Sequence, residues 1–574
     1  MSENNKLNTA NSEAISYNTG ELSITILGGI RLEGLDRLRV TLKIEVSDRK
    51  FKHYLNNPDI ADLAIRHSLD LYNDIQVEKL IRKTAERLEV GSSAITKAIA
   101  DITNQLEEYR LQRIEEQRNN QKPKPKQLTE TEIIEAKLFL QTSGLLQRTN
   151  EAIGNTGLIG EETNRLLMHI IFTSRKRENP LHIISLGSSG TGKTYLQEKV
   201  SELIPEEDKL EITILSENAF YYFGQHELKN KLILIEDLDG AENVLYPLRE
   251  LKSKSKITKT VTIKDTKGQT KTISITVEGP ICVAGCTTKE NIYEDNANRS
   301  FLIYLDESKE QDERIMQRQR LISAGKINTE EEQKIKKLLQ NSQRLLQPIT
   351  VKNPYAEYLK IPEEVFKPRR TNNHYLQFIE AITFYHQYQR EQKVEVSRAN
   401  GNPDSDSVSG QIETSGEIYI ETTLEDIESA NNLMKPILLR KSDELTGACR
   451  SYLEKVKAYI EYENKKTFKN SDIRKALKIN ASNQKRYTLT LTEGFYIKRV
   501  KENKAKGYEY EITSYEEFKQ LQNRISNALD EGLENLKKIF TDKERFSGSE
   551  VVQTINEPLK KKKAKKLQEQ SAMI

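Results

Sequence analysis

The spacing of hydrophobic and polar positions changes several times along the chain, and each change predicts a different kind of element. Residues 21–47 alternate between apolar and polar, which predicts two strands of a small sheet. The spacing becomes helical from about 58 to 118. In residues 179–306, short apolar strands alternate with helices, a pattern typical of an α/β domain with a parallel sheet. Helical spacing returns over 307–395, and a helix–helix–strand pattern occupies about 445–513.

Polar and proline-rich stretches separate these regions and predict a chain of several domains. Alternating proline and lysine in Lys122-Pro-Lys-Pro-Lys126 can form neither a helix nor a strand ladder, so we expect an extended linker there. The predicted parts are a disordered segment (1–20), an N-terminal α+β domain (21–118), a linker (119–127), a helical lead-in (128–178), an α/β core (179–306), a helical lid (307–398), a loop or insertion (399–418), helices with a winged helix-turn-helix (419–515) and a helical, basic tail (516–574).

The composition narrows the class of protein. The chain has 574 residues, of which 36% are hydrophobic and 30% charged, so it is polar but not disordered throughout. No apolar run reaches the ~18 residues that span a bilayer, and we expect no membrane partner. The three cysteines, at 282, 286 and 449, exclude a disulfide framework and fit a reducing cytoplasm. With a net charge of only +3, any affinity for nucleic acid must come from local basic patches.

A glycine-rich loop between a predicted strand (182–186) and a helix starting at Tyr195 carries the strongest chemical signal. Its glycines let the backbone curl so that N–H groups face a phosphate, and the helix N-terminus adds a positive dipole end. We expect Lys193 to neutralise the β- and γ-phosphates of ATP, and the Thr194 hydroxyl to bind Mg²⁺. The predicted nucleotide-binding residues are Gly187, Ser188, Ser189, Gly190, Thr191, Gly192, Lys193 and Thr194.

A second apolar strand (232–235) ends in two carboxylates, Glu236 and Asp237. In a P-loop ATPase one acid holds Mg²⁺, directly or through water, and the next polarises the attacking water. Both residues are therefore candidate catalytic and metal-binding groups. The usual order is Asp then Glu, and here it is reversed. The two roles stay open for this reason, and Asp239 is a competing candidate.

A third buried strand (280–285) is followed by Thr287 and Thr288. AAA+ ATPases place the first sensor of the γ-phosphate at such a strand end, so we select Thr287 as the candidate and Thr288 as its alternative.

Two arginine positions also fit the AAA+ pattern. Arg299 lies at a helix end that leads into a strand, where an arginine commonly projects into the ATP site of the neighbouring subunit. It is the candidate arginine finger; the alternative is a surface arginine that pairs with Asp295 or Asp306. Arg369 and Arg370 open a later helix, and Arg370 is our candidate for a second sensor that touches the nucleotide.

An insert before the third strand predicts a basic hairpin, with strands at 261–263 and 273–277 and a turn at 265–268. Hexameric AAA+ helicases carry a hairpin at this place, which points into the central pore and grips the nucleic-acid backbone. Lysines near such a turn suit phosphate contacts, and the candidates are Lys264, Lys267 and Lys271. The alternative is an edge hairpin that its lysines protect from aggregation.

Residues 468–510 have the pattern of a winged helix-turn-helix. A first helix (468–477) is followed by a candidate recognition helix (482–491) and by a strand–turn–strand wing (497–512). Gln484, Lys485 and Arg486 are the candidates for contact with a DNA groove; the alternative is an adaptor that binds other proteins.

Together these motifs resemble the ATPase part of the large primase–helicase proteins encoded by phages, plasmids and integrative elements, with an MCM-like core in the AAA+ class. The resemblance runs from about 21 to 512 and includes the segments 160–164 and 223–234. It implies an α/β P-loop core with a small N-terminal α+β domain, helical segments and a C-terminal winged helix. It also implies an ATP- and Mg²⁺-dependent DNA helicase or translocase that forms a homo-oligomeric ring on single-stranded and forked DNA during replication of a mobile element.

The chain departs from these proteins in lacking a zinc-ligand cysteine cluster and room for a TOPRIM primase domain, so we expect any primase on a separate chain. Two other functions stay open. One is a non-unwinding initiator or loader ATPase that binds DNA through the winged helix; the basic hairpin favours a motor over it. The other is a transcription regulator without hydrolysis, against which the intact Lys193, Thr194, Glu236 and Asp237 argue.

Overall fold

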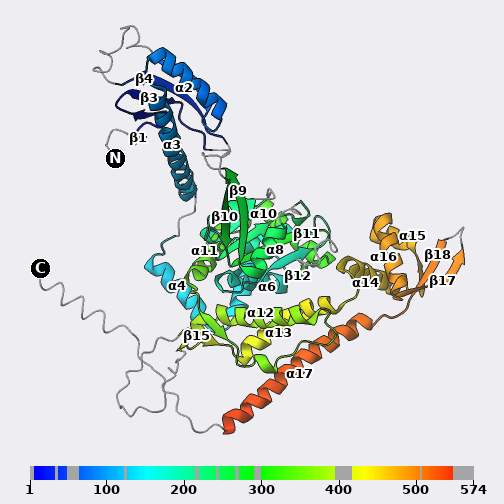
Figure 1. The fold of residues 1–574 in the computed structure, drawn as a ribbon. Helices are drawn as coiled ribbons and strands as arrows, with labels where there is room; N and C mark the ends of the chain where they lie inside the picture. The colour runs from blue at the N-terminus through cyan, green and yellow to red at the C-terminus, as the bar shows by residue number, and fades with distance from the viewer. Residues whose placement is uncertain are drawn as a thin grey trace, which may run out of the picture. The chain divides into compact units, whose positions relative to one another are not determined.

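The structure, a computed structural model, describes residues 6–32, 37–47, 64–121, 126–213, 219–240, 245–264, 270–289, 299–394, 417–503 and 507–546. The chain divides into two compact units, Met1–Pro125 and Lys126–Ile574 (Figure 1). Within the described ranges, no helix combines the length and the apolar character that crossing a membrane requires.

The first unit is an antiparallel sheet with two helices. Its strands lie in chain order: β1 (Leu7–Asn8), β2 (Ala14–Asn18), β3 (Leu22–Leu27), β4 (Arg39–Val46) and β5 (Ile65–Asp70). The helices are α2 (Asp74–Leu88) and α3 (Ser92–Gln121). Alternate residues of β3 and β4 are buried, so the two strands predicted within 21–47 are confirmed.

Two predictions for this unit are wrong. Part of the segment expected to be disordered forms β1 and β2, because Ile15 and Tyr17 alternate with more exposed residues and are buried in the sheet. The Tyr17 hydroxyl also donates a hydrogen bond to Asp101, 2.5 Å away. The region expected to be helical contains β5, whose buried Ile65 and Leu69 are spaced as a helix would space them. Pairing with β4 decides the conformation there.

The second unit is built on a parallel sheet in the order β12-β6-β11-β8-β7. Its central strands are buried along their whole length, as expected for a sheet covered on both faces. This confirms the predicted fold class of an α/β P-loop core. The strands are β6 (Ile183–Leu186), β7 (Lys209–Ile212), β8 (Lys231–Ile235), β11 (Ile281–Thr287) and β12 (Phe301–Tyr304).

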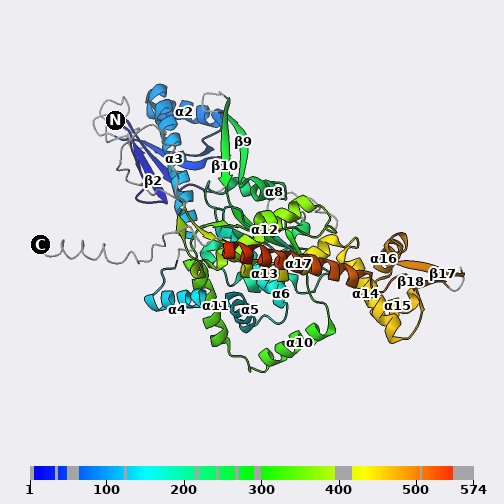
Figure 2. The same cartoon turned by 90° about the horizontal axis from the view of Figure 1, so that it is seen from below.

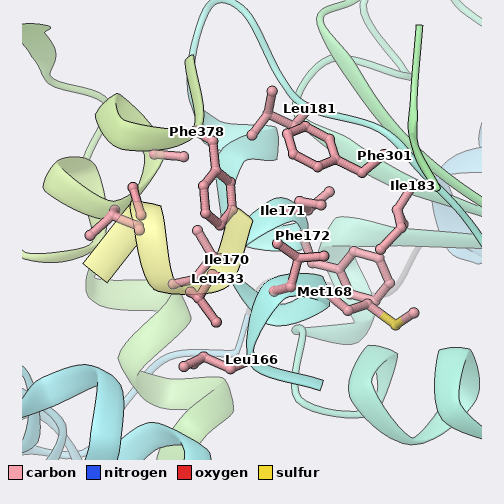
Figure 3. Packing of buried hydrophobic residues seen from close by; sticks show 14 of the residues in the cluster. Leu166, Met168, Ile170, Ile171, Phe172, Leu181, Ile183, Phe301, Phe378 and Leu433 are labelled. Carbon is pink, nitrogen blue, oxygen red and sulfur yellow. The ribbon is translucent and has the colours of Figure 1, made fainter. Parts of the chain in front are cut away.

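Helices cover this sheet, and α6 (Glu162–Thr173) forms the centre of the core. Ile171 and Phe172 of α6 belong to the same buried cluster as Phe301 of β12 and Phe378 of α12 (Figure 3). The other elements of this region are α4 (Glu130–Gln141), α5 (Leu145–Asn155), η3 (Ser174–Lys176), α7 (Lys193–Ser201), η4 (Glu206–Asp208), η5 (Ala219–Tyr222), η6 (Leu238–Gly240), α8 (Leu245–Lys254), β9 (Lys256–Lys264) and β10 (Thr270–Glu278).

Helical segments follow the sheet, as predicted. They are α10 (Lys309–Ser323), α11 (Thr329–Leu345), α12 (Pro368–Tyr385) and α13 (Leu424–Ser442), with short elements between them: β13 (Thr350–Lys352), η8 (Ala356–Tyr358), η9 (Gln387–Gln389), β14 (Lys393–Val394) and β15 (Ile418–Glu421). The strands β13, β15 and β14 form a small sheet that the sequence did not predict.

The C-terminal part contains the predicted winged helix. Its elements are α14 (Gly447–Tyr462), β16 (Thr467–Lys469), α15 (Asn470–Leu477), α16 (Ala481–Glu493), β17 (Ile497–Asn503) and β18 (Gly507–Ile512). The long helix α17 (Glu517–Phe546) then returns and packs along α13 (Figure 2). The lysine-rich end of the predicted tail lies outside the described residues.

Candidate nucleotide site and nucleic-acid interface

The glycine-rich loop lies between β6 and α7, at the carboxyl ends of the parallel strands. Gly190 and Gly192 have φ angles of +85° and +89°, a region that side-chain-bearing residues rarely adopt, so the sequence requires glycine there. A Cβ atom added at Gly190 would meet nothing within 4 Å, which leaves open space in front of the loop. The loop can therefore present its N–H groups to a phosphate.

Lys193 begins α7, and its side chain turns back over the loop. It is buried, and its ammonium donates hydrogen bonds to the carbonyl oxygens of Gly187, at 2.8 Å, and Ser188, at 2.5 Å. A positive group held at the mouth of a glycine loop is placed to meet an anion. The loop residues therefore fit the phosphates of a nucleotide.

The acidic strand end lies beside this loop. Register pairs Ile235 of β8 with Gly285 of β11, and Leu186 with Thr287, so Glu236, Asp237, Thr287 and the loop all follow the same edge of the sheet. The hydroxyl of Thr194 and these carboxylates are oxygen ligands, which Mg²⁺ prefers. No group of three acidic, histidine or cysteine side chains placed to hold a metal ion occurs among the described residues.

Asp239 connects the acidic strand end to the predicted sensor. Its carboxylate accepts hydrogen bonds from the Thr287 hydroxyl, from the Thr288 hydroxyl at 2.7 Å and from the Thr288 amide at 3.1 Å. Its own amide donates to the Asp237 carboxylate at 2.8 Å. Burial raises the pKa of Asp239, but the hydrogen bonds from both threonines outweigh burial and lower it. The sequence named Asp239 only as a competitor for the roles of Glu236 and Asp237, whereas in the structure it contacts Thr287.

Glu236 faces a different environment from Asp237. It lines a small cavity between α7 and β7, together with Glu198 and Glu211. Burial, followed by the charge of Glu236, raises the pKa of Glu198. The two adjacent acids therefore differ in surroundings: Asp237 holds the amide of Asp239, and Glu236 lies next to other carboxylates.

Arg299 lies near the amino ends of the parallel strands, and the phosphate loop lies at their carboxyl ends. Arg299 lies two residues before Phe301, the first residue of β12. Phe301 pairs with Ile183 at the amino end of β6, whereas the phosphate loop follows the carboxyl end. The length of a four-residue strand, roughly 13 Å, separates the two edges. The Nε atom of Arg299 donates to the Ser253 hydroxyl at 2.9 Å. The structure therefore does not bring Arg299 to the phosphate loop of its own chain.

Arg370 lies toward the same edge as Arg299. His374, one turn later on α12, stacks on Phe301 with 5.4 Å between ring centroids. Burial lowers the pKa of His374 to about 3, helped by the charges of Lys441, Arg370 and Lys252. Cationic side chains thus gather at the amino ends of the strands, away from the phosphate loop.

The predicted hairpin consists of β9 and β10, nine residues each, which pair antiparallel from Lys256–Glu278 to Lys264–Thr270. Its base is anchored: Ile257 and Val277 are buried. The ribbon extends away from the sheet in both views (Figures 1 and 2). Of the candidate DNA contacts, Lys264 and Lys271 lie in the two strands near the turn, and Lys267 lies outside the described residues.

The winged helix corrects one predicted contact. Gln484 is 3% exposed and donates to the backbone carbonyl of Asn470 at 2.7 Å, so it fixes α15 against α16 and is not free to enter a groove. Lys485 and Arg486 are exposed on α16, as a groove-facing surface requires. The outward face of α16 also contains Asn483, which the sequence analysis did not select.

Sequence reasoning also missed the residues that follow β12 and border the phosphate loop. A Cβ at Gly187 would lie 3.8 Å from a carboxylate oxygen of Glu307, and one at Gly192 would lie 3.8 Å from Leu305. The segment carries no motif of its own, and only the parallel pairing of β12 with β6 brings it to the loop.

The parallel sheet, the glycine loop and the helix that follows it define a P-loop nucleotide-binding domain. In agreement, residues 130–347 match the model of a protein family described as the MTBMA_p00010 P-loop domain. No curated protein matches the chain.

Three solved structures are distantly similar. A full-length MCM homolog from Methanopyrus kandleri shares 11% identity over 56% of this chain and 64% of its own, with a TM-score of 0.35. The C-terminal region of NrS-1 shares 17% identity over 40% of this chain and 48% of its own, with a TM-score of 0.20. ORC from Drosophila, bound to DNA, shares 11% identity over 71% of this chain and 95% of its own, with a TM-score of 0.20. This chain thus spans less than two thirds of the length of the first two, and none of the three likenesses is close enough to carry a functional argument.

Proposed function

We propose that the protein is an ATP-dependent DNA helicase or translocase, a ring-forming AAA+ motor that acts in replication of a mobile element. One observation carries the proposal. A long basic hairpin is inserted directly before β11, the strand that ends at Thr287 and, through Asp239, contacts the acidic strand end. A hairpin attached to the element that contacts the nucleotide suits a lever that moves when the nucleotide changes.

The residues of the site divide the work of hydrolysis. Lys193 neutralises charge on the β- and γ-phosphates, and the loop amides orient them. Mg²⁺, when bound, would spread the remaining charge of the phosphates and would be held by Thr194 and by one of the acids at 236 and 237. The other acid orients the attacking water. Thr287 reports the state of the site through Asp239.

Arg299 and Arg370 complete the site only in a ring. Because Arg299 lies toward the amino ends of its own strands, and the helix that begins near Arg370 packs there through His374, we assign both arginines to the phosphates of a neighbouring copy. Substrates of such a ring are single-stranded and forked DNA, which the hairpin would grip by its phosphates. Any primase would be a separate partner.

A strand-displacement assay on a forked duplex, with and without ATP and Mg²⁺, tests the proposal. We expect unwinding and ATPase activity in the intact protein, and the loss of both in Lys193→Ala. Removing one such charge-stabilising group typically costs on the order of 10²–10³ in rate. Near-normal turnover by Lys193→Ala would refute the assignment of the site.

A second candidate function is a non-unwinding initiator or loader. The exposed Lys485 and Arg486 on α16 favour it, because a winged helix can hold duplex DNA without translocation. ATPase activity without any strand displacement, together with tight duplex binding, would select this alternative.

A further inference from the structure

A short segment after β12 joins the phosphate loop to the helix that carries the winged helix. We name residues Leu305–Glu307 the junction loop. Leu305 and Glu307 border Gly192 and Gly187, as described above. On its other side, Glu307 pairs with Lys455 of α14 at 3.6 Å. One carboxylate thus stands between the nucleotide loop and the winged-helix arm.

The N-terminus of α6 holds the junction loop in place. Glu161 accepts a hydrogen bond from the amide of Asp306 at 2.7 Å. Asn164 donates to the carbonyl of Tyr304 at 2.9 Å and to Glu161 at 2.6 Å. These two residues belong to the segment 160–164, which the sequence analysis singled out without a role. Their contacts fix the backbone on both sides of Leu305, so the side chains of the junction loop keep a defined place beside the phosphate loop.

The helix α14 is bound firmly to α13 and α17, and its contact with the junction loop is an exposed ion pair. The side chain of Asp443, at the end of α13, is 1% exposed and accepts hydrogen bonds from Arg450 of α14 at 2.7 Å and 2.9 Å. Glu517 of α17 pairs with Lys457 of α14 at 2.9 Å. These partly buried pairs hold α14 to the end of α13 and to the start of α17.

The ion pair with the junction loop is of a different kind. The side chains of Lys455 and Glu307 are 49% and 39% exposed, and exposed pairs contribute little to stability. The ring of Tyr304 packs closely against Gly447 and anchors the start of α14 separately from this ion pair. The ion pair can therefore be strengthened or weakened without unfolding anything, whereas the network around Asp443 cannot.

We propose that the Glu307–Lys455 pair couples occupancy of the phosphate loop to the position of the winged helix. The inference rests on the proposed nucleotide site. Phosphates bound beside Gly187 repel the Glu307 carboxylate and attract the Lys455 ammonium. Bound nucleotide therefore draws the Lys455 side chain toward the loop, and this added contact restrains α14 and, with it, the winged helix. Through this pair, the state of the ATP site sets how the DNA-binding arm is held.

Single substitutions at the two residues should change nucleotide affinity in opposite directions. Lys455→Ala removes the attraction and is expected to weaken binding of adenylyl-imidodiphosphate with Mg²⁺ about two- to five-fold, the range of one exposed charge pair. Glu307→Gln removes the repulsion and is expected to tighten binding by a similar factor. The matched control is Lys465→Ala, just beyond α14, whose ion pair with Glu463 is local; it should change nothing.

Distances between two spin labels in the full chain would test this restraint directly. The native cysteines are buried, so labels can be attached through Asn483→Cys on α16 and Glu330→Cys on α11, both exposed. In the doubly labelled protein, we expect adenylyl-imidodiphosphate with Mg²⁺ to narrow the distribution of label-to-label distances. When Lys455→Ala is added to the same protein, the nucleotide analogue should leave that distribution unchanged.

Two outcomes would overturn the proposal. If the analogue binds and the distribution does not change, or narrows equally in Lys455→Ala, the coupling is wrong and the ATPase function stands. If the analogue does not bind at all, both the coupling and the proposed function are refuted. Substitutions at 307 and 455 that shift affinity in the same direction would also count against an electrostatic link.

Discussion

At the scale of single residues, the acidic strand end divides into three carboxylates with three different surroundings. Asp239 is occupied by Thr287 and Thr288, Asp237 holds the amide of Asp239, and Glu236 faces a cavity lined by other glutamates. Sequence order alone could not separate them, because all three fall within four positions. Only the loop after β8 determines which way each side chain points.

We therefore predict that Glu236 and Asp237 are not equivalent. The acid that orients water can be replaced with nucleotide binding kept, whereas replacing the acid that helps to hold Mg²⁺ should weaken binding and turnover together. Each loss of turnover should be on the order of 10²–10³. Nucleotide binding and ATP turnover of Glu236→Gln and Asp237→Asn measure this. If both variants hydrolyse ATP at the wild-type rate, the catalytic acid is neither Glu236 nor Asp237, and Asp239 becomes the candidate.

Asp426 supplies a prediction for pH dependence. It is fully buried, and although burial raises its pKa, the partners His386 and Arg390 outweigh burial and lower the pKa to about 2. His386 and Arg390 lie 2.8 Å and 2.6 Å from the carboxylate. Because the folded-state pKa lies below the ordinary value of 3.8, this stabilisation is present above about pH 4 and is lost as the pH falls toward 2.

Asp426→Asn should accordingly lower the free energy of unfolding by about 2 kcal/mol at pH 7, the equivalent of the pKa shift. The difference from the wild type should shrink between pH 4 and pH 2. Urea unfolding curves at pH 7, 4 and 3 measure it. A difference that stays constant down to pH 3 would show that the charge of the Asp426 carboxylate is not what stabilises the fold.

At the scale of elements, the sequence predicted those whose periodicity was unambiguous. The continuous apolar runs of β6, β8 and β11, and the alternation in β3 and β4, indicated the strands correctly. Prediction from the sequence failed where pairing with a distant strand determines the conformation. An example is β5, whose apolar residues are also spaced as in a helix. Periodicity also could not set the phase of α16 accurately enough to turn Gln484 inward and Lys485 outward.

The β9–β10 hairpin carries the element-scale prediction, since it separates a motor from a switch. Replacing Lys267 and Lys271 by alanine should abolish unwinding and reduce the stimulation of ATPase by DNA. Folding and basal ATPase should persist, because the hairpin is anchored at its base by Ile257 and Val277 and not by these lysines. Removing one lysine that binds a phosphate should lower the salt slope of single-strand binding by about 0.7.

A forked-duplex unwinding assay and a salt titration of single-strand binding measure these effects. Retained duplex affinity would not contradict the prediction, since the winged helix could still bind duplex. Unwinding at the wild-type rate would show the hairpin to be a protected edge ribbon, and the initiator or loader would become the better function.

At the scale of the whole molecule, the residues proposed for the site lie at opposite ends of the parallel strands. The phosphate loop and the acids follow the carboxyl ends of the strands, and Arg299 and the start of α12 lie toward the amino ends. An interface that joins the amino ends of the strands in one copy to the carboxyl ends in the next is heterologous. Such head-to-tail interfaces close into a ring when the rotation between successive copies allows it. The sequence located each motif, but only the parallel sheet shows that they lie on opposite edges.

The final prediction follows from this separation. Lys193→Ala has a defective phosphate loop and an intact finger, and Arg299→Ala has the reverse, so each variant alone should be inactive. Mixed assemblies contain interfaces where an intact Arg299 meets an intact Lys193, and ATPase should reappear there as the ratio of the two variants is varied. The loss in Arg299→Ala alone should be large, since an arginine supplied in trans contributes on the order of 10³–10⁵ to turnover. Activity that does not depend on protein concentration in a strictly monomeric enzyme would contradict the prediction, because the strand length between Arg299 and its own loop would then have to be bridged within a single chain.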